Sequence, residues 1–184
     1  MSVALGIELR PVRMHYSASS QREKPDSLMK IRIIALGRAK AGPEKSLVET
    51  YAKRLSWTCS IVELEAKKGI SGAELMAAEA ELIEKALGTK ASAKRVIIAL
   101  DERGQSLPSR DFAKRITALG NQGYSELVFI IGGADGLASA IRDRAGLLLS
   151  FGAMTWPHML VRVLLMEQLY RAQTIIAGHP YHRD

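Results

Sequence analysis

The chain has 184 residues, of which 47% are hydrophobic and 24% charged, and its formal net charge at pH 7 is +7. This composition is typical of one globular domain and excludes an intrinsically disordered chain. The basic balance favours a polyanionic partner, although a solvated basic surface is the common alternative. Cys59 is the only cysteine, which excludes an internal disulfide, gives a cysteine-based zinc site no support and fits a reducing cytoplasm.

The first 28 residues differ in character from the rest of the chain. They contain several serines without a sustained hydrophobic period, and their longest apolar run, residues 3–7, is too short for a signal-peptide core. Four basic and three acidic side chains give this segment a charge of +1, so the remainder keeps +6. We therefore predict a disordered N-terminal extension at residues 1–28, which an upstream start codon would explain, and a single domain at residues 29–184.

Beyond Met29, strand-like and helix-like patterns alternate. In chain order we predict a strand at 31–36, a helix at 43–55, a strand at 60–65, a helix at 71–87, a strand at 96–100, a helix at 108–119, a strand at 127–131, a helix at 137–145, a strand at 147–151 and a helix at 157–176. This alternation predicts an α/β fold with a parallel-rich sheet and helices on both faces. Ligands of such sheets bind beyond the carboxyl ends of the strands.

Three predicted strands lead into loops suited to that edge, at residues 100–104, 131–136 and 150–156. The second loop holds Gly132, Gly133 and Gly136, which permit close backbone approach. Their spacing matches neither the dinucleotide fingerprint nor a phosphate-binding loop, which argues against a nucleotide-dependent oxidoreductase. A tight strand-to-helix turn capped by Asp135 is the simpler interpretation of the glycines.

The last predicted helix starts at Pro157, whose missing N–H and fixed φ suit a helix entry. It is apolar nearly all round, which predicts burial against the sheet on one side and a partner subunit on the other. Because it also carries Arg162, Glu167 and Arg171, we expect no membrane span. Glu167 and Arg171 are four residues apart and can pair, either to position a functional group or as an ordinary surface pair.

The tail after this helix is rich in His, Tyr and Arg and either hangs loose or folds back into a site. His179, His182 and Asp184 have a tolerable spacing for metal ligands, but no second ligand cluster accompanies them, and we expect no metal. Serine-nucleophile chemistry has no support either, because a Gly-x-Ser-x-Gly elbow is missing.

Several motifs in fixed order carry a family resemblance. They span residues 29–31, 35–37, 100–101, 129–133, 136–137, 154–158, 160–164, 167–172 and 179–183. Together they are far more specific than any single glycine pattern. Over essentially all of residues 29–184, the chain resembles the RlmH family, small bacterial SPOUT-class methyltransferases of large-subunit ribosomal RNA.

The resemblance implies a SPOUT-type sheet with a C-terminal trefoil knot, S-adenosylmethionine as the cofactor, and a cytoplasmic homodimer. It also implies methylation of N3 of a pseudouridine in 23S ribosomal RNA on the assembled ribosome, by an enzyme without an appended RNA-binding domain. The family's cofactor site maps onto Leu100, Gly132, Gly133, Phe151, Gly152, Ala153, Met154, Thr155 and Trp156.

The chemistry of the acceptor requires a second group of residues. N3 carries a proton between two carbonyls, so that proton must be removed or the resulting anion stabilised. The resemblance covers the residues of the tail and of the last helix, and their individual roles are our hypotheses: His182 is the candidate base, Arg183 and Arg171 the cationic stabilisers, Tyr181 a stacking surface, and Glu167 the residue that orients Arg171. Candidate phosphate contacts on the surface are Arg38, Lys40, Lys67, Lys68, Arg103 and Arg110.

Two alternative functions share these features. A non-catalytic ribosome- or RNA-binding factor would keep the fold and the charge but bind no cofactor. A SPOUT methyltransferase acting on transfer RNA would keep the cofactor site and change the substrate.

Overall fold

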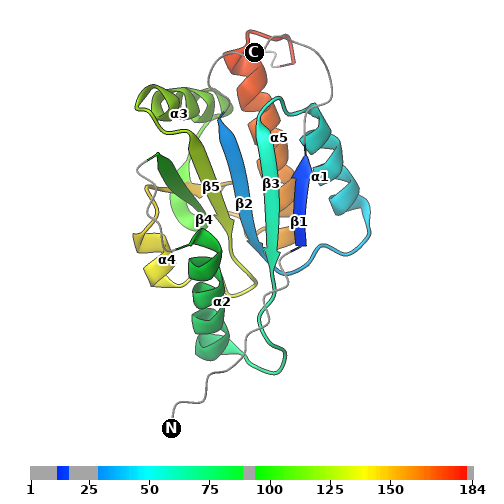
Figure 1. The fold of residues 1–184 in the computed structure, drawn as a ribbon, viewed down its shortest axis with the longest axis vertical. Helices are drawn as coiled ribbons and strands as arrows, with labels where there is room; N and C mark the ends of the chain where they lie inside the picture. The colour runs from blue at the N-terminus through cyan, green and yellow to red at the C-terminus, as the bar shows by residue number, and fades with distance from the viewer. Residues whose placement is uncertain (1–11, 17–28, 89–93, 182–184) are drawn as a thin grey trace.

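The computed structural model describes residues 12–16, 29–88 and 94–181. One six-stranded sheet has the order β1-β3-β2-β5-β4-β6 (Figure 1). Its strands are β1 (Val12–Tyr16), β2 (Lys30–Leu36), β3 (Thr58–Leu64), β4 (Arg95–Ser106), β5 (Glu126–Ile131) and β6 (Leu147–Ser150). Strand β1 pairs antiparallel with β3, whereas every other neighbouring pair is parallel.

Helices cover both faces of this sheet (Figure 1). They are α1 (Pro43–Arg54), α2 (Gly72–Leu87), α3 (Ser109–Asn121), α4 (Ser139–Asp143) and α5 (His158–Ile176). Helices α1, α3 and α5 share one hydrophobic core with the sheet, and α2 and α4 share another. The predicted α/β class, with a parallel-rich sheet between two helical layers, is therefore confirmed.

Side-chain alternation along the strands builds the two cores. In β2, Ile31 and Ile33 enter the core beneath α1, α3 and α5, while Ile34 and Leu36 enter the core beneath α2 and α4. Strand β5 is buried on both faces in the same way, with Phe129 on one side and Ile130 on the other. Burial on both faces explains why these strands are continuous apolar runs in the sequence.

The ten predicted elements are all present, with differences at their ends. Strand β4 continues to Ser106, beyond the predicted end at 100, because Gln105 and Ser106 pair with Leu149 and Ser150 of β6 after a register shift. The polar stretch at 101–104 had predicted a loop. Helix α4 is shorter than the predicted 137–145.

Strand β1 was not predicted, because the first 28 residues show no hydrophobic period. Residues 12–16 pair along β3 from Val12 opposite Glu63 to Tyr16 opposite Cys59. The remainder of residues 1–28 lies outside the described part of the chain. The prediction of a disordered extension is untested there.

Helix α5 begins at the carboxyl edge of the sheet and runs back between α1 and α3 (Figure 1). Leu165, Met166 and Leu169 are fully buried on its inner side, whereas Leu160 and Ile176 remain exposed. Within the residues described, no helix has both the length and the apolar character needed to cross a membrane.

Candidate active site

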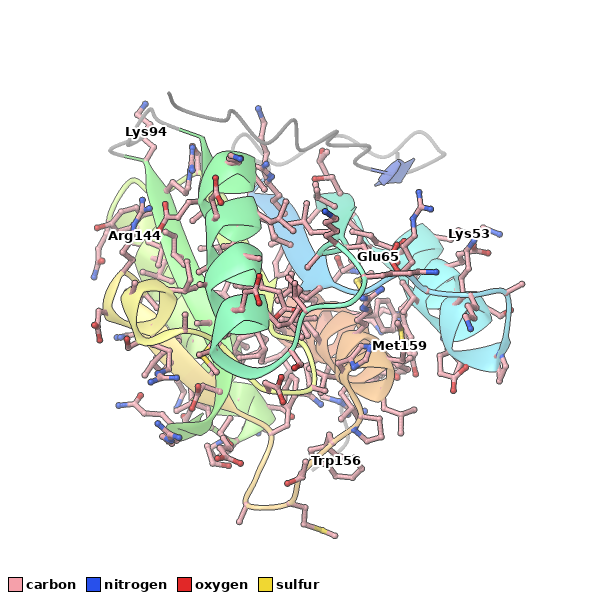
Figure 2. The ribbon with its side chains drawn as sticks, turned by 90° about the horizontal axis from the view of Figure 1, so that it is seen from below. Lys53, Glu65, Lys94, Arg144, Trp156 and Met159 are labelled. Atoms are coloured by element: carbon pink, nitrogen blue, oxygen red, sulfur yellow. The ribbon has the colours of Figure 1, made fainter. Side chains whose placement is uncertain are left out.

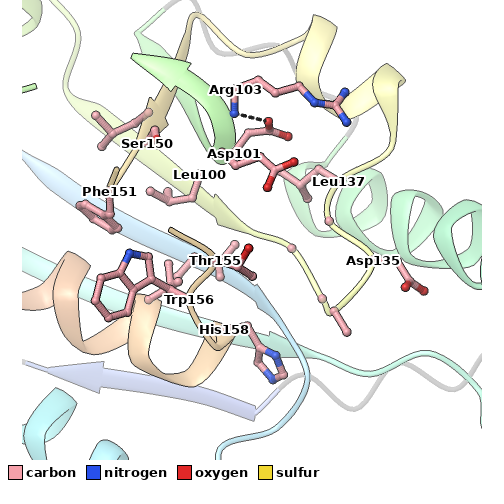
Figure 3. A pocket seen from close by; sticks show the side chains of 18 of the residues that line it. Leu100, Asp101, Arg103, Asp135, Leu137, Ser150, Phe151, Thr155, Trp156 and His158 are labelled. Atoms are coloured by element: carbon pink, nitrogen blue, oxygen red, sulfur yellow. Dashed lines mark hydrogen bonds between the residues drawn. The ribbon is translucent and has the colours of Figure 1, made fainter. Parts of the chain in front are cut away.

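Three segments at the carboxyl edge line a cavity of about 290 Å³ (Figure 3). Residues 100–103 lie within β4, where its pairing with β6 shifts register, and the other two segments are the loops after β5 and β6. The three segments are adjacent because β4, β5 and β6 are parallel neighbours. The cavity is lined by eight of the nine residues predicted for the cofactor, Leu100, Gly132, Gly133, Phe151, Gly152, Met154, Thr155 and Trp156. Ala153 does not line it.

The glycine turn after β5 allows a close approach of backbone to the cavity. A Cβ added at Gly132 would lie 2.9 Å from the carbonyl carbon of Gly136, so the turn closes only with glycine at this position. Gly136 adopts φ +79° and its N–H donates to the carbonyl of Gly133 at 3.2 Å. A Cβ at Gly133 would instead meet the end of the Glu79 side chain, 2.9 Å away.

Polar contacts order the segment of β4 that lines the cavity and the loop after β6. The N–H of Arg103 donates to Asp101 Oδ1 at 3.0 Å, and Arg142 Nη1 lies 3.9 Å from Asp101 Oδ2. At the end of β6, Ser150 Oγ donates to the carbonyl of Gly152 at 3.0 Å and accepts its N–H at 3.2 Å. These contacts fix the conformation of both segments around the cavity.

The rim of the cavity carries exposed apolar side chains. Met154 is 74% exposed and Trp156 is 40% exposed. In Figure 2, Trp156 lies on a loop that extends away from the rest of the fold. Large apolar side chains left in water beside a cavity are typical of a surface that meets a ligand or a partner.

Helix α5 supplies two further lining residues, His158 and Val161, which the sequence had not singled out for the cavity. Burial lowers the pKa of His158 below its usual value, and the nearby positive charge of Arg162 lowers it further. Both effects favour the uncharged form of the imidazole. The only sequence signal that could have assigned His158 and Val161 to the cavity was their position. Both lie in the first turns of a helix that starts at the edge of the sheet where ligands bind, and they are three residues apart, on one side of that helix.

The residues predicted to handle the acceptor form a separate cluster, which we call the α5 cluster: Glu167, Arg171 and Tyr181. Arg171 Nε and Nη2 donate to Glu167 Oε1 at 2.9 and 2.5 Å, and the Tyr181 hydroxyl donates to the same oxygen at 3.3 Å. The Arg171 guanidinium lies 5.0 Å from the centre of the Tyr181 ring. His182 and Arg183 lie outside the described residues.

The electrostatics of the α5 cluster fix its protonation. The hydrogen bond that Arg171 donates to Glu167 raises the pKa of Arg171, so this cation is retained. Burial, helped by a hydrogen bond with Tyr51, raises the pKa of Tyr181 to about 12. Tyr181 is therefore a neutral phenol that donates a hydrogen bond, and the cluster presents a guanidinium paired with Glu167 and an aromatic ring.

Within one protomer the α5 cluster lies away from the cavity. Glu167 and Arg171 follow Val161, the last cavity-lining residue of α5, by six and ten residues, or about 9 and 15 Å along the helix axis. None of the three cluster residues lines the cavity. The tail as far as Tyr181 folds back onto α5, with the centre of the Tyr181 ring 4.7 Å from that of the Tyr170 ring.

A metal centre has no support in the described part of the chain, where no group of three or more His, Cys, Asp or Glu side chains could hold an ion. Of the three tail residues with ligand-like spacing, only His179 lies within that part.

Fold and cavity together define the class of protein. The family model described as "Predicted SPOUT methyltransferase" matches residues 29–182. The chain therefore belongs to the SPOUT methyltransferase family. Its fold is also similar to that of a solved probable methyltransferase from Bordetella pertussis, with a TM-score of 0.50, 15% identity, and coverage of 79% of this chain and 95% of that one.

Curated relatives give a more specific match than the family model. The chain is 51% identical over 155 residues to ribosomal RNA large subunit methyltransferase H of Rhodospirillum centenum. It is 44% identical over 163 residues to the protein of the same name from Bradyrhizobium diazoefficiens. Each match covers 84% of this chain and 99% of the relative.

Proposed function

We propose that this protein transfers the methyl group of S-adenosylmethionine to N3 of a pseudouridine in large-subunit ribosomal RNA. The observation that carries the proposal is the cavity at the carboxyl edge, because its walls are the loops that the resemblance assigned to the methyl donor. Relatives that match over 99% of their length are named as methyltransferases of the same RNA. We expect the protein to act in the cytoplasm, where its substrate is.

The residues of the cavity fit the methyl donor. The Gly132 turn is a cradle that a single added Cβ would fill. Leu100, Phe151 and Trp156 give apolar surface for an adenine ring, and the backbone of the loop after β6 supplies hydrogen-bonding groups. The donor, when bound, supplies an activated methyl group on a sulfonium, for which no metal is needed.

The α5 cluster and the tail beyond it fit the acceptor. Removing the N3 proton leaves negative charge on the base, and the Arg171 guanidinium, fixed by Glu167, is a preorganised partner for that charge. The Tyr181 ring offers a face on which a base can stack. His182 remains the candidate base, and Arg183 a second cation.

A homodimer would bring the two halves of the site together. In one protomer the α5 cluster lies beyond the cavity, so a second copy is the simplest source of the missing half. The partner surface would include the outer side of α5, where Leu160 and Ile176 are 37% and 46% exposed. We propose that the dimer packs through α5, with the cavity of one copy beside the cluster of the other.

We also propose that the chain forms a trefoil knot at the cavity. Strand β6 lies at the end of the sheet, next to β4, whereas α5 begins beside Gly37 at the end of β2. Residues 151–157 therefore cross the carboxyl edge past β4 and β5. A knot requires one segment of backbone to pass through a loop, and residues 151–157 cross beside the loop after β5.

The RNA would meet a basic surface beside the cavity. Arg38, Lys40, Lys67 and Lys68 are exposed and lie on the loops after β2 and β3, at the same edge of the sheet as the cavity. Because neutralising each phosphate releases counterions, changing all four to Gln should flatten the log–log dependence of ribosome affinity on salt by about 3. Filter binding across a salt series measures this slope.

A matched control uses Lys53 and Lys85, which are exposed in the last turns of α1 and α2, at the opposite edge of the sheet. Changing both to Gln should leave the slope unchanged. Equal effects of the two sets of substitutions would contradict a localised RNA surface.

Titration calorimetry with S-adenosylmethionine, followed by transfer of labelled methyl, tests the function directly. We expect saturable donor binding and label in 23S RNA when whole ribosomes are offered. A protein that binds ribosomes but no donor would be the non-catalytic factor, and label in transfer RNA alone would indicate the other substrate. Mass mapping of the labelled nucleoside tests the N3 assignment.

A further inference from the structure

A buried ion pair joins α5 to the ends of two strands. Arg162 Nη1 donates to Glu63 Oε1 at 2.6 Å, and Nη2 donates to the carbonyls of Leu36 and Gly37, each at 2.8 Å. Glu63 also accepts the N–H of Ala39 at 3.0 Å. The guanidinium of Arg162 therefore forms hydrogen bonds at the carboxyl ends of both β2 and β3.

Stability alone does not account for this pair. Its side chains are only 3% and 5% exposed, so both charges have lost their hydration. Burying an ion pair in this way is often no more stabilising than well-packed apolar residues of the same volume. Arg162 Nε is moreover buried without a hydrogen-bond partner among the described residues, which adds a further cost.

The pair lies directly behind the wall of the cavity. His158 and Val161, the two lining residues of α5, precede Arg162 by one helical turn and by one residue. Gly37, whose carbonyl Arg162 holds, packs against His158: a Cβ added there would lie 3.2 Å from His158 Nε2. Arg162 therefore holds the end of β2, which is the strand end against which the imidazole packs.

The same contact affects charge at the cavity. Burial first, and then the positive charge of Arg162, lower the pKa of His158. Glu63 faces Arg162 from β3, and the other charged groups that line the cavity are Asp101, Glu102, Arg103, Asp135 and Arg142. An uncharged imidazole adds no positive charge to a pocket that is to receive a cationic sulfonium.

We propose that Arg162 and Glu63 are positioning residues, which hold the first turn of α5, with His158 and Val161, against the methyl-donor pocket. The inference rests on the proposed function, since it assigns the cavity to the donor. It adds a role for two residues that do not line the cavity.

The decisive variant replaces both partners with apolar residues, Glu63→Leu with Arg162→Met. We expect this protein to melt close to the wild type, because the pair contributes little net stability. Donor affinity in calorimetry should fall about tenfold or more, because a small shift of a positioned wall is costly. The pKa of His158, followed by NMR, should rise as the neighbouring positive charge is removed.

Arg95 and Glu126 provide the matched control. They form an ion pair at 3.0 Å between the first residues of β4 and β5, at the other edge of the sheet, and Arg95 also donates to the carbonyl of Leu87. Glu126→Gln should change donor affinity by less than about twofold, because it is remote from the cavity.

Wild-type donor affinity in the double variant would overturn the inference. Should that variant not fold, Glu63→Gln decides: an affinity loss larger than that of Glu126→Gln supports the inference, and an equal loss overturns it. Failure of the wild type to bind the donor would instead refute the proposed function, so the two failures are distinguishable.

Discussion

Gly132→Ala is expected to abolish binding of the methyl donor. The added Cβ would lie 2.9 and 3.0 Å from the carbonyl carbon and oxygen of Gly136, and backbone atoms in a closed turn cannot move aside as a side chain can. The turn must open, which destabilises the fold by about 1–3 kcal/mol and displaces a wall of the cavity. Thermal unfolding and calorimetry with S-adenosylmethionine measure the two effects.

Gly133→Ala is the matched control, one residue along the same turn. Its Cβ would meet Glu79 Oε1 at 2.9 Å, but this atom is the end of a flexible side chain that can rotate away. We expect a much smaller loss of stability and of affinity at this position. Similar losses in the two variants would show that backbone closure at Gly132 does not shape the pocket.

Glu167→Gln is expected to reduce turnover by about a hundredfold while leaving donor affinity near the wild-type value. The substitution keeps the shape of the side chain but removes the carboxylate that holds Arg171 through two hydrogen bonds. Donor binding should persist, because Glu167 does not line the cavity. Single-turnover methylation of ribosomes and calorimetry separate the two quantities.

Gln173→Ala serves as the control on the same helix. Gln173 accepts from Ser56 and donates to the carbonyl of Arg54, so it connects α5 to the end of α1. Its turnover should remain close to that of the wild type. A hundredfold loss here as well would mean that turnover reports the general integrity of α5.

Mixing variants tests whether two copies share a site. In the proposed dimer, refolding Gly132→Ala and Glu167→Gln proteins together would make half of the pairs mixed, and each mixed pair would have one intact cavity facing one intact α5 cluster. The mixture should regain roughly a quarter of wild-type activity if the halves belong to different subunits. No recovery would place both halves in one protomer and would contradict the proposed dimer arrangement.

Hydrophobic patterning predicted most of the fold because its causes are local. The apolar runs in β2 and β5 and the helical spacing in α1 and α2 reflect which face of each element is buried. Strand β1 was missed because its pairing with β3 comes from a segment without a pattern of its own. The end of β4 was missed because Asp101 to Gly104 looks like a loop until β6 lies beside it.

The sequence by itself determined the parallel-rich architecture, the family, and three chain segments that had to meet, since the carboxyl ends of parallel strands share one edge. Only the tertiary structure placed Arg162 on Glu63, residues 99 positions apart in the chain, and put His158 against the end of β2. It alone showed that the α5 cluster lies along the helix from the cavity. Contacts between distant segments depend on how elements pack, and no local pattern of residues encodes that.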